Sequence, residues 1–254
     1  MGECFVYELK LRLADKNIAA TVSYESTVRF CREYISEFTS ADAVISVEPE
    51  DIISERAMAE RQADMDGTNS DFSDAYLETL AFYRKIALEL VNHGVILFHG
   101  SAVALDGECY LFTAKSGTGK STHTRLWRET FGERAVMVND DKPLIALSDG
   151  GAIVYGTPWC GKHRLGNNIS APLKALCILE RAEENVITDL SRRAAFPEIF
   201  AQTYRAPNPM FMQKTMHLLD KLLNIVPAYR LGCNMEKDAP IVSYNKMKGN
   251  KNEA

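Results

Sequence analysis

Hydrophobic and polar positions alternate along the first part of the chain. From Cys4 to Leu13 the apolar side chains fall on every second residue, which predicts a β-strand, and Ile18–Val22 predicts a second strand after a polar turn. The spacing changes to that of a helix over residues 24–38, and the β-branched run Ala43–Val47 predicts another strand. Pro49, followed by two acidic residues, favours the start of a helix. These patterns predict a small mixed α/β module.

A polar stretch separates this module from the rest of the chain. Residues 64–71 contain glycine and show no hydrophobic period, which is typical of a linker. We therefore predict two domains, a small N-terminal α/β module of residues 1–66 and a larger domain of residues 67–254. The larger domain should begin with a long helix, capped by Asp71, and ending near the glycine that follows His93.

Strands and helices alternate in the larger domain. Strands are predicted at Val95–Phe98, Ser101–Leu105 and Glu108–Thr113, with an Asp106-Gly107 hairpin turn between the last two. A helix at residues 121–130 and a buried strand at Ala135–Val138 follow. Further strands are expected at Ala152–Tyr155, Leu173–Leu179 and Pro227–Leu231, and helices over residues 191–225, broken at Pro207-Asn208-Pro209, and over Glu236–Tyr244. The predicted fold class is α/β.

One loop matches a phosphate-binding pattern. The segment from Ala114 to Ser121 reads Ala-Lys-Ser-Gly-Thr-Gly-Lys-Ser, and it fits the Walker A pattern Gly-x-x-x-x-Gly-Lys-[Ser/Thr] except at Ala114. Glycines let successive backbone N–H groups turn toward a phosphate, and the helix that follows adds its positive end. Lys120 would neutralise the β/γ-phosphates and the Ser121 hydroxyl would bind Mg²⁺. The alternative is a glycine-rich turn with a solvated lysine.

Two acidic residues follow the next buried strand. Asp140 and Asp141 come directly after Asn139, where a second contact to magnesium belongs in a P-loop protein. One carboxylate can hold the metal while the other accepts a proton from an attacking hydroxyl. The alternative is an ordinary strand-ending turn, which also favours Asn and Asp.

Two further segments are candidates for the same site. His99 lies just before the hairpin that leads into the loop, where it could face the γ-phosphate or be a structural residue. The segment from Gly156 to Gly166 is rich in glycine and carries Lys162 and Arg164, which could act on a transferring phosphoryl group. The alternative for this segment is an exposed basic turn.

Composition and charge narrow the function classes. The chain has 254 residues, 46% of them hydrophobic, so there is ample apolar surface to form a core. Lys and Arg number 29 against 34 Asp and Glu, and the net charge of −5 argues against a nucleic-acid partner. No apolar run approaches the ~20 residues needed to cross a bilayer, and no secretory signal is recognisable. The six cysteines lack metal-binding spacing, so we expect a cytoplasmic protein without structural disulfides.

Three segments resemble those of the HPr kinase/phosphorylase and phosphoenolpyruvate carboxykinase superfamily. They are His99-Gly100-Ser101-Ala102, Ser116-Gly117-Thr118-Gly119-Lys120-Ser121 and Val138-Asn139-Asp140-Asp141. HPr kinases have a His-Gly pair, a strand hairpin, Ser-Gly-x-Gly-Lys-Ser and a hydrophobic strand that ends in Asp-Asp. The resemblance implies an α/β P-loop kinase core of the HPr kinase/PEP carboxykinase type behind the small N-terminal module.

The resemblance also implies a role for each matching residue. The nucleotide-binding set is Ser116, Gly117, Thr118, Gly119, Lys120, Ser121 and Thr122. Asp140 and Asp141 would form a metal-and-base pair, and we take Asp140 as the base and Asp141, with Ser121, as the magnesium ligands. His99 would lie beside the transferred phosphate.

The sequence thus predicts an ATP- and Mg²⁺-dependent kinase. It would transfer the γ-phosphoryl group to a hydroxyl, serine foremost, of a protein, peptide or small metabolite. The sequence does not determine whether the protein forms a homo-oligomer. Two alternatives are a carboxykinase-like lyase and a nucleotide-binding sensor without catalysis.

Overall fold

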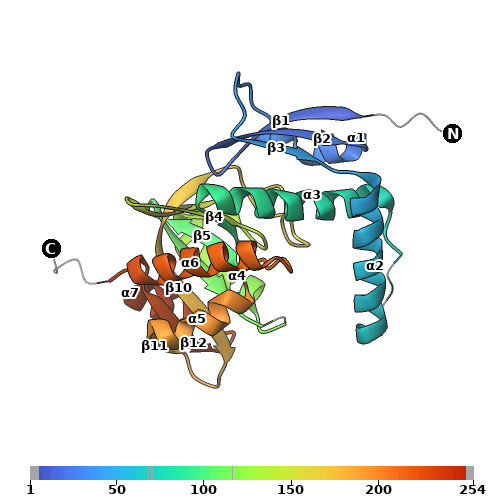
Figure 1. Ribbon diagram of the computed structural model, residues 1–254. Coiled ribbons are helices and arrows are strands. Elements are labelled where there is room, and N and C mark those ends of the chain that lie inside the picture. Colours follow the sequence, from blue (N-terminus) through green and yellow to red (C-terminus); the bar gives the residue numbers. More distant parts are fainter. Residues whose placement is uncertain (1–5, 68, 70, 116, 250–254) are drawn as a thin grey trace. The chain divides into compact units, whose positions relative to one another are not determined.

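The structure is a computed structural model, which describes residues 6–67, 69, 71–115 and 117–249. The chain divides into two compact units, Met1–Leu90 and Val91–Ala254 (Figure 1). Both units combine helices and strands, so the predicted mixed α/β class is confirmed. Parts of the sequence predictions fall outside the described residues: the start of the first predicted strand at Cys4, residues 68 and 70 of the predicted linker, and Ser116 in the glycine-rich loop.

The first unit is built on a small sheet in the order β1-β2-β3. Its elements are β1 (Tyr7–Leu13), β2 (Lys16–Val22), α1 (Glu25–Phe30), a 3-10 helix (Arg32–Tyr34), β3 (Ala43–Ser46), α2 (Pro49–Asp66) and α3 (Asp74–Leu90). Strands β1 and β2 are antiparallel, whereas β3 runs parallel to β2. The side chain of Glu78, fully buried on α3, accepts hydrogen bonds from the backbone of Ser23 and from the Thr27 hydroxyl. The Tyr24 N–H also donates to it, at 3.2 Å, so this carboxylate binds the segment that leads into α1.

The division between the units falls later than the sequence placed it. We predicted a boundary after residue 66, within the polar stretch 64–71, whereas the compact units meet after Leu90. Helix α2 continues into that stretch as far as Asp66, and Gly67, in the left-handed conformation, follows it. Helix α3 is joined to α2 by ion pairs from Arg84 to Glu55 and from Lys85 to Asp51, each 2.5 Å long. Helix α3 therefore belongs to the first unit, where its ion-pair partners lie.

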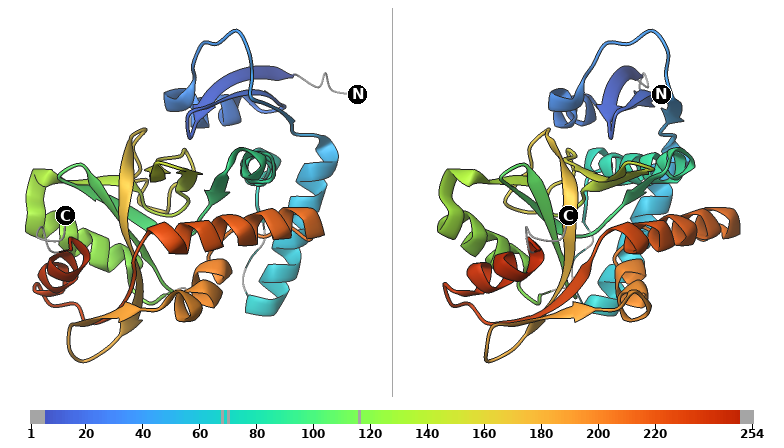
Figure 2. Two further views of the ribbon diagram at one scale, coloured as in Figure 1. Left: turned by 60° about the vertical axis from the view of Figure 1, so that its left-hand side comes forward. Right: turned by 90° about the vertical axis from the view of Figure 1, so that its left-hand side faces the viewer.

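The second unit contains a larger mixed sheet in the order β4-β8-β9-β10-β6-β5-β7, with β12 beside β10 and β11 beside β12. Its elements are a 3-10 helix (Val91–His93), β4 (Val95–Leu97), β5 (Ser101–Leu105), β6 (Glu108–Thr113), α4 (Lys120–Phe131), a 3-10 helix (Gly132–Arg134), β7 (Ala135–Asn139), β8 (Leu144–Ser148), β9 (Gly151–Tyr155), β10 (Ser170–Arg181), β11 (Val186–Leu190), α5 (Arg192–Ala201), α6 (Pro209–Ile225), β12 (Ala228–Cys233) and α7 (Ala239–Met247). Strands β6, β10 and β12 are parallel. Figure 2 shows α4 and α7 on one side of this sheet and α5 and α6 on the other.

The core beneath α4 is aromatic. Trp127 is fully buried and packs on Tyr110 and Phe112 of β6 with ring centroids 5.1 Å apart in each case. Its indole Nε1 donates to His123 Nε2 at 3.1 Å and to the Ser243 hydroxyl of α7 at 3.0 Å. This network fastens α4, the helix that follows the glycine-rich loop, to α7.

Two expectations about composition can be compared with the described residues. None of the cysteines that the structure describes takes part in a disulfide. No helix in the described ranges is both long and apolar enough to cross a membrane.

Candidate functional site

The topology of the second unit brings three separate segments to one edge of the sheet. Strand β5 lies between β6 and β7 and is antiparallel to both. The carboxyl ends of β6 and β7 therefore meet the start of β5 at the same edge. The glycine-rich loop follows β6, Asp140 and Asp141 follow β7, and His99 precedes β5. Ligands of open α/β sheets bind outside such carboxyl ends.

The backbone of the glycine-rich loop depends on two of its glycines. Gly117 and Gly119 have φ angles of +74° and +119°, which side chains other than glycine rarely adopt. Helix α4 begins at Lys120, so its first N–H groups and the positive end of its dipole face the loop. Ala114, the departure from the Walker pattern, is 2% exposed and packs in the core, which explains why a small apolar residue is accepted there.

Lys120 lies across this loop. Its ammonium donates to the carbonyl of Ala114 at 3.2 Å. Burial lowers the pKa of Lys120, the carboxylate of Asp141 opposes this shift, and the positive charge of Lys142 adds to it. Ser121 and Thr122 follow in the first turn of α4. The lysine is thus within electrostatic reach of the segment after β7.

His99, Asp141 and Lys142 form a cluster around one carboxylate oxygen. Asp141 Oδ1 lies 3.3 Å from His99 Nε2 and 3.1 Å from Lys142 Nζ. Burial lowers the pKa of His99 to about 4, and the charges of Lys142 and Lys120 act in the same direction, while Asp141 opposes them. His99 is therefore neutral at pH 7.

A buried asparagine fixes the turn that carries the two acidic residues. Asn139 is fully buried, and its Oδ1 accepts from the backbone N–H groups of Asp141 (2.8 Å) and Lys142 (2.7 Å). Its Nδ2 donates to the Thr157 carbonyl at 3.1 Å. The Asp140 carboxylate accepts from the Gly161 N–H at 2.7 Å. The segment from Gly156 to Gly166 is therefore joined to the acidic turn, through both Asn139 and Asp140.

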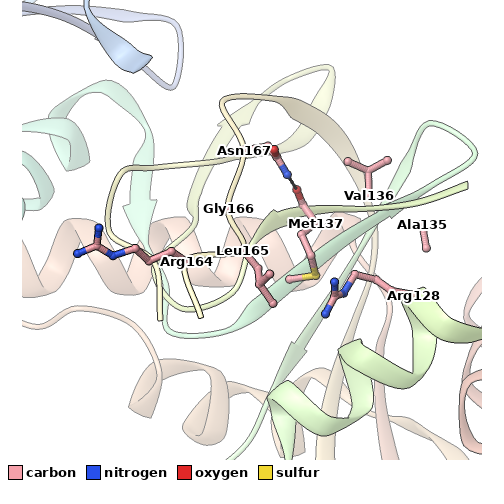
Figure 3. A pocket seen from close by; sticks show the side chains of 8 residues that line it. All are labelled: Arg128, Ala135, Val136, Met137, Arg164, Leu165, Gly166 and Asn167. Carbon is pink, nitrogen blue, oxygen red and sulfur yellow. Dashed lines mark hydrogen bonds between the residues drawn. The ribbon is translucent and has the colours of Figure 1, made fainter. Parts of the chain in front are cut away.

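The two cations predicted in that segment are not brought into the cluster by any contact within the described residues. Lys162 and Arg164 are both exposed. Arg164 lines an open hollow of about 370 Å³ beside β7, together with Arg128, Met137 and Leu165 (Figure 3). In that view the Arg164 side chain extends away from Arg128, so the two guanidinium groups do not converge on a common ligand.

Sequence reasoning missed three polar residues at this edge. Lys142 follows the acidic pair directly, and its charge next to two carboxylates was a signal that could have been used. The backbone carbonyl of Gln202 accepts a hydrogen bond from the His99 backbone N–H at 2.7 Å, and the Gln202 side chain hydrogen-bonds the His99 side chain. Arg181, at the end of β10, donates to the Gly117 carbonyl at 2.6 Å. The last two contacts depend on strand order, which no local pattern reveals.

The residues that could hold a metal are oxygen donors of the kind Mg²⁺ prefers, namely the Ser121 hydroxyl and the carboxylates of Asp140 and Asp141. Each carboxylate already has a protein partner, Gly161 N–H for Asp140 and His99 with Lys142 for Asp141. No cluster of three or more His, Cys, Asp or Glu side chains with metal-binding geometry occurs among the described residues. A magnesium ion here would thus need phosphate oxygens or water to complete its shell, as is usual for Mg²⁺.

No family model and no curated protein matches the chain. Among solved structures, the chain is similar to one described as the HPr(Ser) kinase/phosphatase from Coxiella burnetii. The identity is 11%, the match covers 60% of this chain and 99% of the other, and the TM-score is 0.34. Because the identity and the TM-score are both low, this similarity gives no evidence about function.

Proposed function

We propose that this protein is an ATP- and Mg²⁺-dependent phosphotransferase that transfers the γ-phosphoryl group to a hydroxyl group, serine foremost, of a protein, peptide or small metabolite. One observation carries the proposal. The glycine-rich loop with Lys120 lies at the same sheet edge as Asp141 and His99, and the charges of Lys120 and Asp141 act on each other and on the pKa of His99. Phosphoryl transfer needs little more than such positioning and charge neutralisation.

The nucleotide would bind along the loop. Backbone N–H groups from Gly117 to Ser121 and the start of α4 suit its phosphates, and Thr122 lies beside them in the first turn. Lys120 would pair with the β- and γ-phosphates. Ser121 and Asp141 would hold the magnesium ion, which, when bound, neutralises negative charge on the phosphates.

The acidic pair would divide the remaining work. The acceptor oxygen forms a bond to the γ-phosphorus as the bond to the bridging oxygen of ADP breaks, and the hydroxyl proton passes to the Asp140 carboxylate. The Gly161 N–H holds that carboxylate in place. His99, neutral at pH 7, can donate or accept a hydrogen bond at the transferred group without adding charge.

The experiment that tests this proposal measures ADP release from ATP with and without hydroxyl acceptors, using serine, threonine and tyrosine peptides and small hydroxy compounds. We expect magnesium-dependent release that an acceptor stimulates, and phosphate found on the acceptor. Nucleotide binding without any turnover would favour the sensor instead. Dependence on oxaloacetate or phosphoenolpyruvate would favour the lyase.

The Lys120→Ala variant tests nucleotide binding. It removes a charge aimed at the phosphates, so the affinity for Mg·ATP should fall by about 1.5–3 kcal/mol, the range for hydrogen bonds to charged groups. Isothermal titration calorimetry measures this change directly. Lys115→Ala, an exposed lysine in the same loop, is the control and should bind ATP nearly as the wild type does. Equal affinity in wild type and Lys120→Ala would contradict the assignment of the phosphate-binding loop.

A further inference from the structure

Lys142 is held more firmly than a surface lysine needs to be. Its backbone N–H is bound by the buried Asn139 side chain at 2.7 Å, and its carbonyl accepts from the Thr157 hydroxyl at 2.8 Å. The next residue, Pro143, accepts from the Phe98 N–H at 3.1 Å. The main chain at position 142 is therefore fixed from both sides, as is typical of residues that must present a side chain in one place.

The ammonium group of Lys142 is directed into the candidate site. It lies 3.1 Å from Asp141 Oδ1, and the side chain is only 25% exposed. His99 Nε2 approaches the same oxygen at 3.3 Å. Lys142 thus shares its partner with a residue that is already part of the proposed site.

The charges at this point do not balance. Lys120 and Lys142 are both positive and near enough for the charge of one to act on the other. The carboxylate of Asp141 opposes the effect of Lys142 on the pKa of Lys120. The Asp140 carboxylate accepts from the Gly161 N–H and does not shift the pKa of Lys120. Two partly buried ammonium groups beside the Asp141 carboxylate therefore leave an excess positive charge at this point, which costs free energy unless an anion is bound there. A γ-phosphoryl group supplies such an anion.

We propose that Lys142 is a further catalytic residue, whose ammonium group binds the γ-phosphoryl group and stabilises its negative charge during transfer. This inference rests on the proposed phosphotransferase function. Lys120 and Lys142 would contact the same phosphate from two segments, the start of α4 and the turn after β7. Lys120 would contact the β-phosphate as well, whereas Lys142 would contact only the terminal one.

The difference between ATP and ADP tests this assignment. In Lys142→Gln the affinity for a non-hydrolysable ATP analogue should fall about tenfold or more, the size expected for a lost charge-assisted contact, while the affinity for ADP should change less than about twofold. Lys142→Arg keeps the charge and should recover most of the discrimination. Lys174→Gln is the matched control. The Lys174 side chain is 35% exposed, and its ammonium forms a similar ion pair with Glu108 at 3.0 Å. It should leave both affinities unchanged.

The outcomes separate this inference from the proposed function. Suppose that the wild type binds ADP and the ATP analogue. If Lys142→Gln then lowers the two affinities equally, or lowers neither, Lys142 does not contact the γ-phosphoryl group and the inference is wrong. If the wild type binds neither nucleotide, the proposed function is wrong and the inference fails with it. A circular dichroism melting curve for Lys142→Gln within a few degrees of the wild type's would show that the variant is folded.

Discussion

At the scale of single residues, Asn139 organises the candidate site. An asparagine side chain has both a carbonyl and an amino group, and here the carbonyl binds two backbone N–H groups of the acidic turn while the amino group binds the Thr157 segment. An aspartate could not donate the second contact and would bury a charge at a position with no exposure. The position of both carboxylates therefore depends on one neutral amide.

Asp140→Asn and Asp141→Asn should each lower phosphoryl transfer by about 100-fold or more, the low end of general-base and charge-stabilisation effects. The two variants should differ in their response to magnesium. Added Mg²⁺ should partly restore Asp141→Asn, because that variant loses a metal ligand, and it should not restore Asp140→Asn. A magnesium titration of the transfer rate for both variants measures this, and near wild-type rates in both would contradict the proposed mechanism.

The sequence named candidate residues of this site but not their arrangement. His99, Lys120 and the acidic pair follow from local motifs. Lys142 was not considered, although its charge directly follows the acidic pair; its shared contact with His99 on Asp141 is seen only in the folded turn. Arg181 was missed because its contact with Gly117 spans 64 residues and requires β10 beside β6.

At the scale of elements, the hairpin of β5 and β6 and the junction of β6 with α4 agree with prediction, since each has a strong local signal. Asp106 and Gly107 both have positive φ, as a tight hairpin turn requires. Two short strands, β8 and β11, were not predicted. The Asp149-Gly150 turn after β8 was a hairpin signal that could have been used, since β8 pairs with β9 across it. Strand β11 is mostly exposed and has no comparable apolar pattern. The helix predicted over residues 24–38 ends at Phe30, and a 3-10 helix follows it.

The segment from Gly156 to Gly166 gives a prediction about its two cations. The segment touches Asp140 through Gly161, one residue before Lys162, so Lys162→Ala should lower turnover more than it lowers ATP affinity. Arg164 lines the hollow beside β7, and Arg164→Ala should have the smaller effect. Steady-state kinetics of the two single variants separates them. Wild-type turnover in both would leave this segment as an exposed basic turn.

The contact between α4 and α7 makes stability depend on pH. His123 Nε2 accepts a hydrogen bond from Trp127, and burial lowers the pKa of His123 to about 4, from an ordinary value of 6.5. Because the unfolded chain binds a proton at His123 at higher pH than the folded chain does, this residue reduces the free energy of unfolding as pH falls from 6.5 to about 4. The loss should be up to about 3 kcal/mol.

Urea unfolding of wild type and His123→Gln at pH 7, 5.5 and 4.5 tests this expectation, since glutamine keeps a polar side chain that does not titrate. Carboxylates protonate equally in both proteins, so the difference between them isolates His123. The stability of the wild type should fall more steeply toward low pH. A difference that stays constant across the three pH values would contradict a neutral buried His123.

At the scale of the whole molecule, the proposed site lies entirely within the second compact unit. A fragment of residues 91–254 should therefore bind Mg·ATP with the affinity of the full chain. A fragment of residues 67–254, cut at the boundary predicted from sequence, would keep α3 without α2 and would leave the buried Glu78 without its partners Ser23 and Thr27. We expect it to aggregate more, as measured by size-exclusion chromatography, and loss of nucleotide binding in residues 91–254 would show that the site needs the first unit.

The predicted domain boundary shows what a linker pattern can establish. Residues 64–71 are polar, as a linker should be. Polarity indicates only that a segment lies at the surface, and it does not show which of the two units the next helix belongs to. That choice depends on pairs such as Arg84 with Glu55, which join α3 to α2. These pairs are far apart in sequence, so periodicity and composition do not predict them.

The most direct test of the central proposal is a crystal structure with Mg²⁺ and a non-hydrolysable ATP analogue. We expect the β- and γ-phosphates within the loop that precedes Lys120, and the metal beside Ser121. At least one of the two carboxylates, Asp140 or Asp141, should lie within about 6 Å of the metal or γ-phosphate, the reach of a direct or one-water contact. Phosphates bound elsewhere, or both carboxylates beyond that distance, would contradict phosphoryl transfer at this site.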